Sequence, residues 1–393
     1  MFMLRSLCFM LACTAASLTA QEDPAPTIPQ LTKEGDALYL KGDYEAARLA
    51  FASAWDLAQQ TPRDNPVRYD ILKRLTSVRA AAGEFADADN WLQQAITWRE
   101  NTLGQKDHKI ADDLLISVAL CRGMKDFDRA QVILRRVLSL HVEFYTYLSA
   151  MVADDFSRMG SVYAEQENLD AAINSIDAAL DIRTKLGGPM DPALIPDLDR
   201  LGEYRTTMRA YDQAEAAFRH ALVIRETLYG KIHADLISTV DGLAFALFGQ
   251  QKYDQADPVY QRLIGLWESN VGKDHPMVAV ALDKLAVFYA AWKKYPEARD
   301  ALERSTAIRA RFLALGISQQ AAQAFTEGQL DQAKAFYRRG LAVLDPPNPI
   351  NEDLRGQLEG ALRKLDAPPP RSGAPVKRLP APLPTPPKKD GKL

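Results

Sequence analysis

Residues 271–276 have the sequence VGKDHP, which brings together three side chains that can bind metals or transfer protons: Lys273, Asp274 and His275. Histidine is a common zinc ligand and exchanges protons near neutral pH. The chain contains only 5 histidines, so a catalytic or metal site would be expected to use one of them. Related stretches occur as YGKIHA at 229–234 and LGQKDH at 103–108. The spacing between these stretches indicates whether the residues form an active site or have a structural role.

The spacing between these stretches is that of an internal repeat. His233 and His275 lie 42 residues apart. At nearly the same interval an alanine recurs, preceded three residues earlier by a mostly aromatic position and followed four residues later by a bulky apolar residue. The alanines are Ala47, Ala88, Ala130, Ala172, Ala214, Ala256, Ala298 and Ala333. Steps of three and four residues define one face of a helix, and a second helical pattern precedes each face. Each of the eight units is therefore predicted to be two helices joined by a short turn.

This pattern resembles the tetratricopeptide repeat. The family signature appears as Met159-Gly160-x-x-Tyr163 and as Ala214-x-x-x-Phe218. The usual period is 34 residues, and the longer period here is similar to that of the kinesin-light-chain type. The resemblance implies an all-α, right-handed α-solenoid of about eight helix-turn-helix units over residues 28–350, closed by a capping helix at 351–365. It also implies that peptides or helices bind along a concave face lined by the first helices.

The repeat argues against an active site at the histidines, because equivalent turns of stacked units stay one repeat apart. In one such turn Asp191 replaces the histidine, which suits turn and helix-start chemistry. The sequence contains no phosphate-binding loop, nucleophile elbow or cysteine-histidine pair. We therefore predict that the protein is not an enzyme and uses no metal and no cofactor.

Six aspartates on the predicted first helices follow the 42-residue step. They are Asp70, Asp112 and Asp154 near the helix starts, and Asp199, Asp241 and Asp283 one turn deeper. Capping of the helix is the favoured interpretation for the first three, with a role in the groove as the alternative. The deeper three, with Glu203, are predicted to form an acidic groove floor. The expected ligand is a protein or peptide segment of basic or mixed charge, and nucleic acid is not expected.

Two basic residues complete the predicted groove. Lys73 and Arg158 match two of five positions at which some family members capture a C-terminal carboxylate. Ser77, Ile116 and Asp154 depart from that pattern, so carboxylate capture is not predicted.

The junction between the third and fourth units differs from the others. The sequence HVEFYTYLSAM at 141–151 places Phe144, Tyr145 and Tyr147 where other units carry glycine or proline. The favoured interpretation is a longer helix whose aromatic side chains fill a gap in the stack. The alternative is an exposed aromatic contact for a partner or for a second copy in a homo-oligomer.

The two ends of the chain predict its location and a possible form of regulation. Residues 1–20 have the layout of a cleaved secretory signal peptide, followed by a linker at 21–27, so a periplasmic or secreted protein with no membrane span is expected. A lipoprotein acylated at Cys13 is the lesser alternative. Residues 366–393 carry nine prolines and a net charge of +4, against −8 for residues 21–365, and are expected to be a disordered basic tail.

The sequence thus favours a protein-protein interaction scaffold of the bacterial cell envelope or secreted space. The alternative is a self-regulated adaptor whose basic tail occupies the groove or contacts anionic envelope components.

Overall fold

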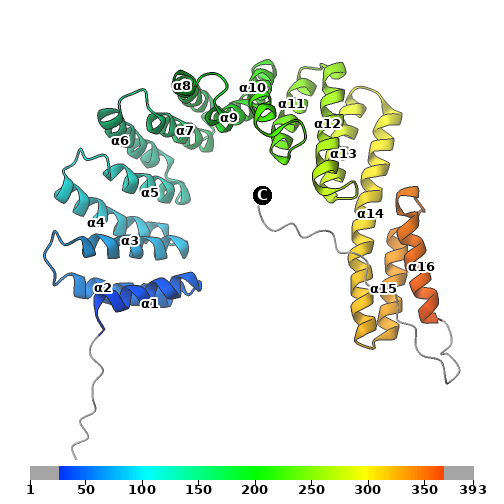
Figure 1. Cartoon of the computed structure of the whole chain (residues 1–393), viewed down its shortest axis with the longest axis horizontal. Coiled ribbons are helices and arrows are strands. Elements are labelled where there is room, and N and C mark those ends of the chain that lie inside the picture. Colours follow the sequence, from blue (N-terminus) through cyan, green and yellow to red (C-terminus); the bar gives the residue numbers. More distant parts are fainter. Residues whose placement is uncertain (1–25, 367–393) are drawn as a thin grey trace, which may run out of the picture. The chain divides into compact units, whose positions relative to one another are not determined.

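The computed structural model describes residues 26–366 (Figure 1). The predicted signal peptide, most of the linker and the tail beyond Asp366 lie outside these residues. The described part contains sixteen α-helices, three short 3-10 helices and no strands. It belongs to two compact units that meet in sequence at Phe144 and Tyr145.

The first unit consists of six helices and the second of ten. The first has α1 (Ile28–Leu40), α2 (Tyr44–Ala58), α3 (Pro66–Ala81), α4 (Phe85–Leu103), α5 (Ile110–Gly123) and α6 (Phe127–Tyr145, whose last residue falls in the second unit). The second has α7 (Ala150–Glu165), α8 (Leu169–Gly187), α9 (Ile195–Thr207), α10 (Tyr211–Tyr229), α11 (Ile237–Gly249), α12 (Tyr253–Val271), α13 (Pro276–Ala291), α14 (Tyr295–Thr326), α15 (Leu330–Val343) and α16 (Glu352–Asp366). The 3-10 helices are η1 (Pro192–Leu194), η2 (Ala234–Leu236) and η3 (Pro349–Asn351).

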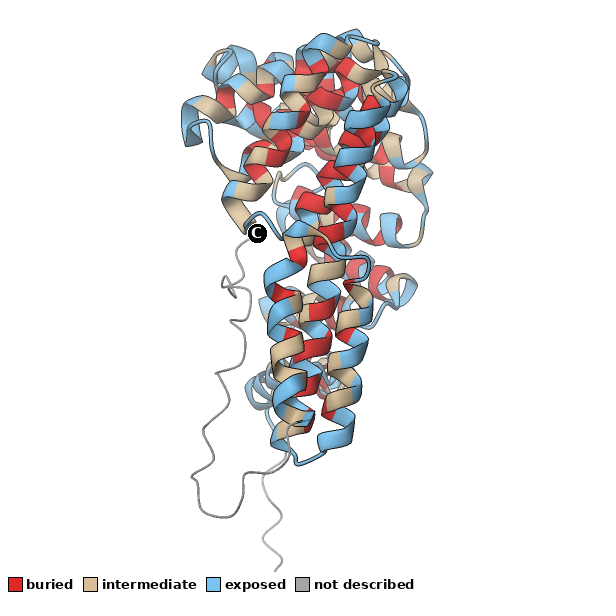
Figure 2. Ribbon diagram, turned by 90° about the vertical axis from the view of Figure 1, so that its right-hand side faces the viewer, coloured by how far each residue is buried: buried red, intermediate tan, exposed pale blue. Residues whose placement is uncertain are grey.

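The repeated alanines form the contact between helices of a pair. Seven of them are fully buried and Ala298 is 7% exposed. Close approach is clearest at Phe218, whose ring lies between Gly202 and Gly242. A Cβ atom on either glycine would lie 2.5 Å from that ring. Buried residues therefore lie on the sides of the helices that pack against other helices, and exposed residues lie on the opposite sides (Figure 2).

The turns between units explain the VGKDHP stretch. Gly272 ends α12 with a φ of 95°, a conformation that favours glycine. His275 is the N-cap of α13, and its Nδ1 atom accepts a hydrogen bond from the amide of Met277 at 3.2 Å. His233 and Asp191 accept equivalent bonds before η2 and η1. These side chains start helices, which is a structural role.

The last units depart from the predicted helix-turn-helix pattern. α14 is 32 residues long and supplies both the second helix of the seventh unit and the first helix of the eighth. No turn residue interrupts residues 303–315, so the helix continues. The repeat pattern places Leu302 in the core, but the rotation of α14 about its axis leaves this residue 50% exposed. Asn351 lies in η3, and its side-chain amide donates to the Ala307 carbonyl at 3.0 Å.

Within residues 26–366, no helix combines the length and the hydropathy needed to cross a membrane.

Candidate interaction surface

The first helices carry buried carboxylates at equivalent positions of successive repeats. Asp113, Asp155 and Asp197 follow the 42-residue step and are at most 1% exposed. Thr239 takes the equivalent place in α11 and is also fully buried. Sequence reasoning missed these buried carboxylates. The regular spacing of 113, 155 and 197 was a signal that could have found it.

In the first unit, Asp113 is held by three side chains. Lys73 Nζ lies 2.6 Å from its Oδ1 atom, and Arg99 Nη1 lies 3.3 Å from Oδ2. The Tyr69 hydroxyl donates to the same carboxylate at 2.9 Å. Burial, with this hydrogen bond, raises the pKa of Tyr69. Lys73 is therefore committed to a buried partner and is not available to capture a ligand carboxylate.

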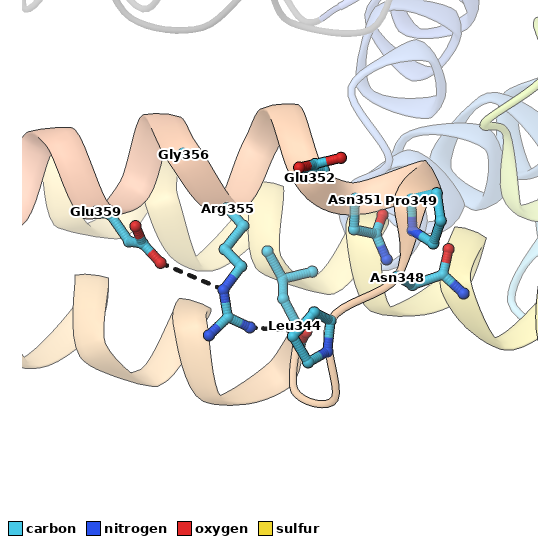
Figure 3. Close-up of a pocket in the computed structure, with 9 residues that line it drawn as sticks. Leu344, Asn348, Pro349, Asn351, Glu352, Arg355, Gly356 and Glu359 are labelled. Carbon is cyan, nitrogen blue, oxygen red and sulfur yellow. Dashed lines mark hydrogen bonds and ion pairs between the residues drawn. The ribbon is translucent and has the colours of Figure 1, made fainter.

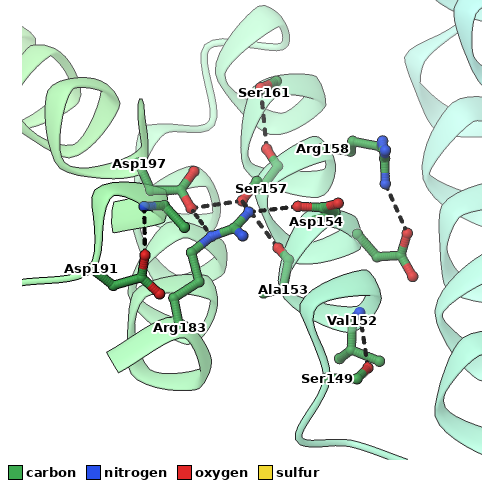
Figure 4. A network of polar contacts seen from close by, with 12 residues as sticks. Ser149, Val152, Ala153, Asp154, Ser157, Arg158, Ser161, Arg183, Asp191 and Asp197 are labelled. Carbon is green, nitrogen blue, oxygen red and sulfur yellow. Dashed lines mark hydrogen bonds and ion pairs between the residues drawn. The ribbon is translucent and has the colours of Figure 1, made fainter. Parts of the chain in front are cut away.

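In the second unit, Arg183 of α8 joins two aspartates of neighbouring first helices (Figure 4). Its guanidinium lies 2.7 Å from Asp154 in α7 and 2.9 Å from Asp197 in α9. Asp197 also accepts from Ser157 Oγ at 2.9 Å and from Arg200 at 3.1 Å. This network ties two repeats together through charge as well as through apolar packing.

The deeper aspartates are also paired. Arg225 Nη2 lies 2.7 Å from Asp199, and Arg309 contacts Asp283. Asp241 instead pairs with Lys284 Nζ at 2.5 Å. Arg99, Arg183, Arg225 and Arg309 occupy equivalent positions of their second helices, separated by one or two 42-residue steps. The predicted acidic floor therefore carries less net negative charge than its aspartates suggest.

The remaining predicted acids are more open to solvent. Asp70 and Asp112 are exposed, and their side chains have no ion-pair partner within the described chain. Helix capping does not explain Asp70 or Asp154, because the N-caps of α3 and α7 are Asn65 and Ser149.

Two other predicted groove residues lie beside aspartates of the first helices. Glu203 is exposed, yet partial burial of its carboxyl raises its pKa, and the Asp199 charge adds to the rise. Arg158 Nη1 lies 3.2 Å from Asp155 Oδ1 on the same helix.

The aromatic residues at the third junction are exposed. Phe144 is 57% exposed, Tyr147 is 52% exposed and Tyr145 is 37% exposed. The Phe144 ring stacks on His108 at 3.7 Å, and Tyr147 meets Phe156 edge-on at 6.1 Å. α6 has 19 residues, as α4 and α8 do, so the prediction of a longer helix that buries these rings is wrong.

Apolar side chains that sequence reasoning did not select lie between the outer ion pairs of α11 and α13. Phe245, Val280 and Val287 are 46%, 40% and 62% exposed. Phe245 and Val287 stand one 42-residue step apart, each one helical turn after an aspartate. The Lys284–Asp241 pair bridges the two helices and shows that these faces adjoin. We call this surface the α11–α13 face; it comprises Asp241, Phe245, Val280, Asp283, Lys284 and Val287.

A depression of about 490 Å³ lies at the start of α16 (Figure 3). Arg355 crosses it and donates to Glu359 at 3.2 Å and to the Leu344 carbonyl at 3.4 Å. Asn351 Oδ1 is a buried acceptor without a hydrogen-bond partner there. The described residues contain no group of three histidine, cysteine or carboxylate side chains that could hold a metal.

Comparison with known proteins agrees with this architecture. A family model described as tetratricopeptide repeat matches residues 152–227 and 236–311. The two matches begin 84 residues apart, which is two repeats of 42. No curated protein sequence matches the chain.

One solved structure has a similar fold, and two others show lower similarity. The C-terminal part of a TPR repeat-containing protein from Cytophaga hutchinsonii is 16% identical, covers 70% of this chain and 95% of its own, and has a TM-score of 0.50. BtubC (BKLC) from P. vanneervenii is 18% identical, with coverages of 57% and 89% and a TM-score of 0.48. A Podosopora anserina protein described as a kinesin light chain with nearly identical TPR-like repeats is 15% identical, with coverages of 52% and 94% and a TM-score of 0.45.

The helix pairs, the buried alanines, the 42-residue period and the family match agree: the described part of this chain is an all-α array of helix pairs, and its residues 152–227 and 236–311 match the tetratricopeptide repeat.

Proposed function

We propose that this protein is a non-enzymatic scaffold that binds an extended protein segment on the first helices of its second unit. We further propose that it acts in the bacterial cell envelope or the secreted space. The proposed location rests on the signal-peptide layout of residues 1–20. The proposed binding mode rests on the α11–α13 face, which exposes apolar side chains beside exchangeable charges.

The energies of the ion pairs distinguish ligand contacts from structural contacts. Lys284 and Asp241 are 47% and 33% exposed, and such a pair contributes only about 0–1 kcal/mol. A ligand ammonium can therefore replace Lys284 beside Asp241 at little cost. Asp113 and Asp197 are buried, and removing a partner from them costs several times more, about 3–5 kcal/mol. The buried aspartates thus hold neighbouring repeats together within each unit, while the more exposed aspartates are free to exchange partners.

Phe245 and Val287 determine the apolar part of the ligand. Complete burial of such a side chain contributes about 1.5–3 kcal/mol. Because both are already partly buried, a ligand would gain about half of that at each. A segment that places apolar residues between lysines or arginines matches this surface, and its binding should weaken as salt screens the outer charges.

A peptide selection tests this proposal. Random peptides of about 12 residues, a length that spans about 40 Å when extended, are displayed and selected on the full chain, and the enriched peptides are measured by fluorescence anisotropy. We expect enrichment of apolar residues flanked by basic ones. Phe245→Ser should weaken binding about 5- to 10-fold, in line with about 1 kcal/mol of lost burial.

The matched control is Val223→Ser, because Val223 is 51% exposed but lies on α10, away from the first helices. It should leave peptide affinity unchanged. Selection of acidic peptides, or equal losses for Phe245→Ser and Val223→Ser, would refute the proposed binding face.

A further inference from the structure

The distal half of α14 presents an unusual exposed face. As α14 runs past α13 toward its hairpin with α15 (Figure 1), its buried side is formed by Ala314, Ile317, Ala321 and Ala324. The other side is open to solvent. We call it the α14 face; it comprises Phe312, Leu313, Gly316, Gln319, Gln320 and Gln323.

This face carries no charge. Residues 312–326 read FLALGISQQAAQAFT and contain no charged side chain, although 25% of the whole chain is charged. Exposed helix faces are normally rich in charged residues. Phe312 and Leu313 are nevertheless 51% and 54% exposed. Exposed apolar residues beside uncharged polar ones are typical of a surface that meets another protein.

The shape of the face suits a second helix. Phe312, Leu313, Gly316 and Gln320 line an open depression of about 590 Å³ with Arg339 of α15 at its side. Gly316 lies at the middle, and a Cβ atom built on it would meet no other atom within 4 Å. The backbone is therefore accessible at this point, so a partner helix can approach closely.

We propose that the α14 face is the self-association surface of the protein, where it meets the same face of a second copy about a twofold axis. In such a contact the same surface of both copies forms the interface, so the two interacting faces have the same residues. A face with charges of one sign would repel itself, whereas this one has none. Glutamine amides both donate and accept hydrogen bonds, so they can pair with glutamines of the second copy.

The charge at the edge of this face argues against binding of the chain's own tail. The tail is basic, with a net charge of +4 over residues 366–393. Arg339 is the one charged side chain lining the depression, and it has the same sign as the tail. A second copy can keep both Arg339 side chains at the rim, where their charges stay in water.

The size of the face predicts a weak dimer. Residues 312–323 span about 18 Å of helix, so the buried area is expected to fall below the roughly 800 Å² per partner of a standard interface. We expect a dissociation constant in about the micromolar range.

Sedimentation velocity of the full chain over a range of concentrations tests the proposal. We expect a monomer-dimer equilibrium whose constant changes less than about 2-fold between low and high salt, because no ion pair is involved. Gly316→Lys should raise the dissociation constant at least about 10-fold. The lysine fills the depression, and its charge lies close to the same charge of the second copy and repels it. Phe312→Ser should weaken the dimer in the same direction.

Gly316→Lys has a built-in control for folding. Lysine has a higher helix propensity than glycine, and the space around Gly316 is open, so the thermal midpoint should not fall. Gly356→Lys is the matched variant, because Gly356 is also an exposed, unobstructed helical glycine but lines the separate depression at α16 (Figure 3). It should dimerise as the parent does.

Any one of four results would overturn the proposal. The first three are a chain that stays monomeric at about 100 µM, well above a micromolar constant; a Gly316→Lys variant that dimerises normally; and equal losses for Gly316→Lys and Gly356→Lys. A dimer that dissociates at high salt would also overturn it, because that behaviour indicates a charged interface elsewhere.

Discussion

Replacing Asp197 by alanine should destabilise the second unit more than any change at the exposed aspartates. Asp197 is 1% exposed. It accepts hydrogen bonds from Arg183 at 2.9 Å, Ser157 at 2.9 Å and Arg200 at 3.1 Å. Asp197→Ala removes all three at once and leaves Arg183, whose side chain is 13% exposed, with Asp154 as its remaining carboxylate.

The expected loss in the free energy of unfolding depends on the partners that Arg183 and Arg200 keep after the substitution. Removing one partner of a buried ion pair costs about 3–5 kcal/mol. Here Asp154 remains 2.7 Å from Arg183, and the Arg200 side chain, 40% exposed, can turn to water. We therefore expect a loss of about 2–3 kcal/mol in the free energy of unfolding. Asp154→Ala should cost less than about 1 kcal/mol, because Asp154 is 40% exposed.

Urea unfolding followed by circular dichroism measures both losses, and hydrogen exchange shows whether they are localised in α7, α8 and α9. The double variant Arg183→Met with Asp197→Leu should recover much of the loss, because it leaves no unpaired buried charge at this position. If Asp197→Ala cost no more than Asp154→Ala, the assignment of the buried carboxylates as the link between repeats would be refuted.

Three further predictions concern a turn, a charge and the tail. Thr146 has a φ of 73° at the position where Gly104 and Gly188 end the preceding and following second helices, so Thr146→Gly should raise the free energy of unfolding by about 1 kcal/mol in urea titrations; a loss would contradict this. At Glu215, burial opposes ionisation, but hydrogen bonds from Lys252, Arg219 and Gln250 outweigh it and lower the pKa to about 2 from 4.5. The ionised carboxylate contributes on the order of 1–2 kcal/mol of stability after allowance for solvent. This contribution is present above pH 4.5 and is lost as pH falls toward 2. The difference in the free energy of unfolding between the parent and Glu215→Gln should therefore shrink over that pH range rather than stay constant. Deleting residues 367–393 should strengthen binding of a selected basic peptide if the tail competes for the α11–α13 face, and an unchanged affinity would exclude that competition.

The fold was predictable because the information that specifies it is local and repeated. The small residue at each helix crossing and the apolar face around it recur at a constant interval, as Ala172 and Ala214 illustrate. The side chains of His233 and His275, which first suggested chemistry, accept backbone hydrogen bonds at helix starts. Each of these features depends on residues close together in the chain, so the tetratricopeptide repeat could be predicted without a structure.

The candidate surface was predicted less well, because a constant interval does not fix the rotation of a helix. Asp112 and Asp113 are adjacent in sequence but lie about 100° apart around the helix axis. The first is exposed and the second is fully buried. Both keep the 42-residue step, so periodicity alone could not choose between them. The arginines that neutralise the deeper aspartates, such as Arg225 beside Asp199, come from another helix 26 residues away.

The sequence by itself determined the repeat, the helix pairs and the turns, since propensity, capping and the spacing of apolar residues act over a few neighbouring positions. Only the tertiary structure decided which aspartates are buried, which ion pairs can exchange with a ligand, and that α14 continues through the expected turn to expose an uncharged face. Those properties depend on how each helix is rotated against its neighbours, and that rotation is set by packing between residues far apart in the chain.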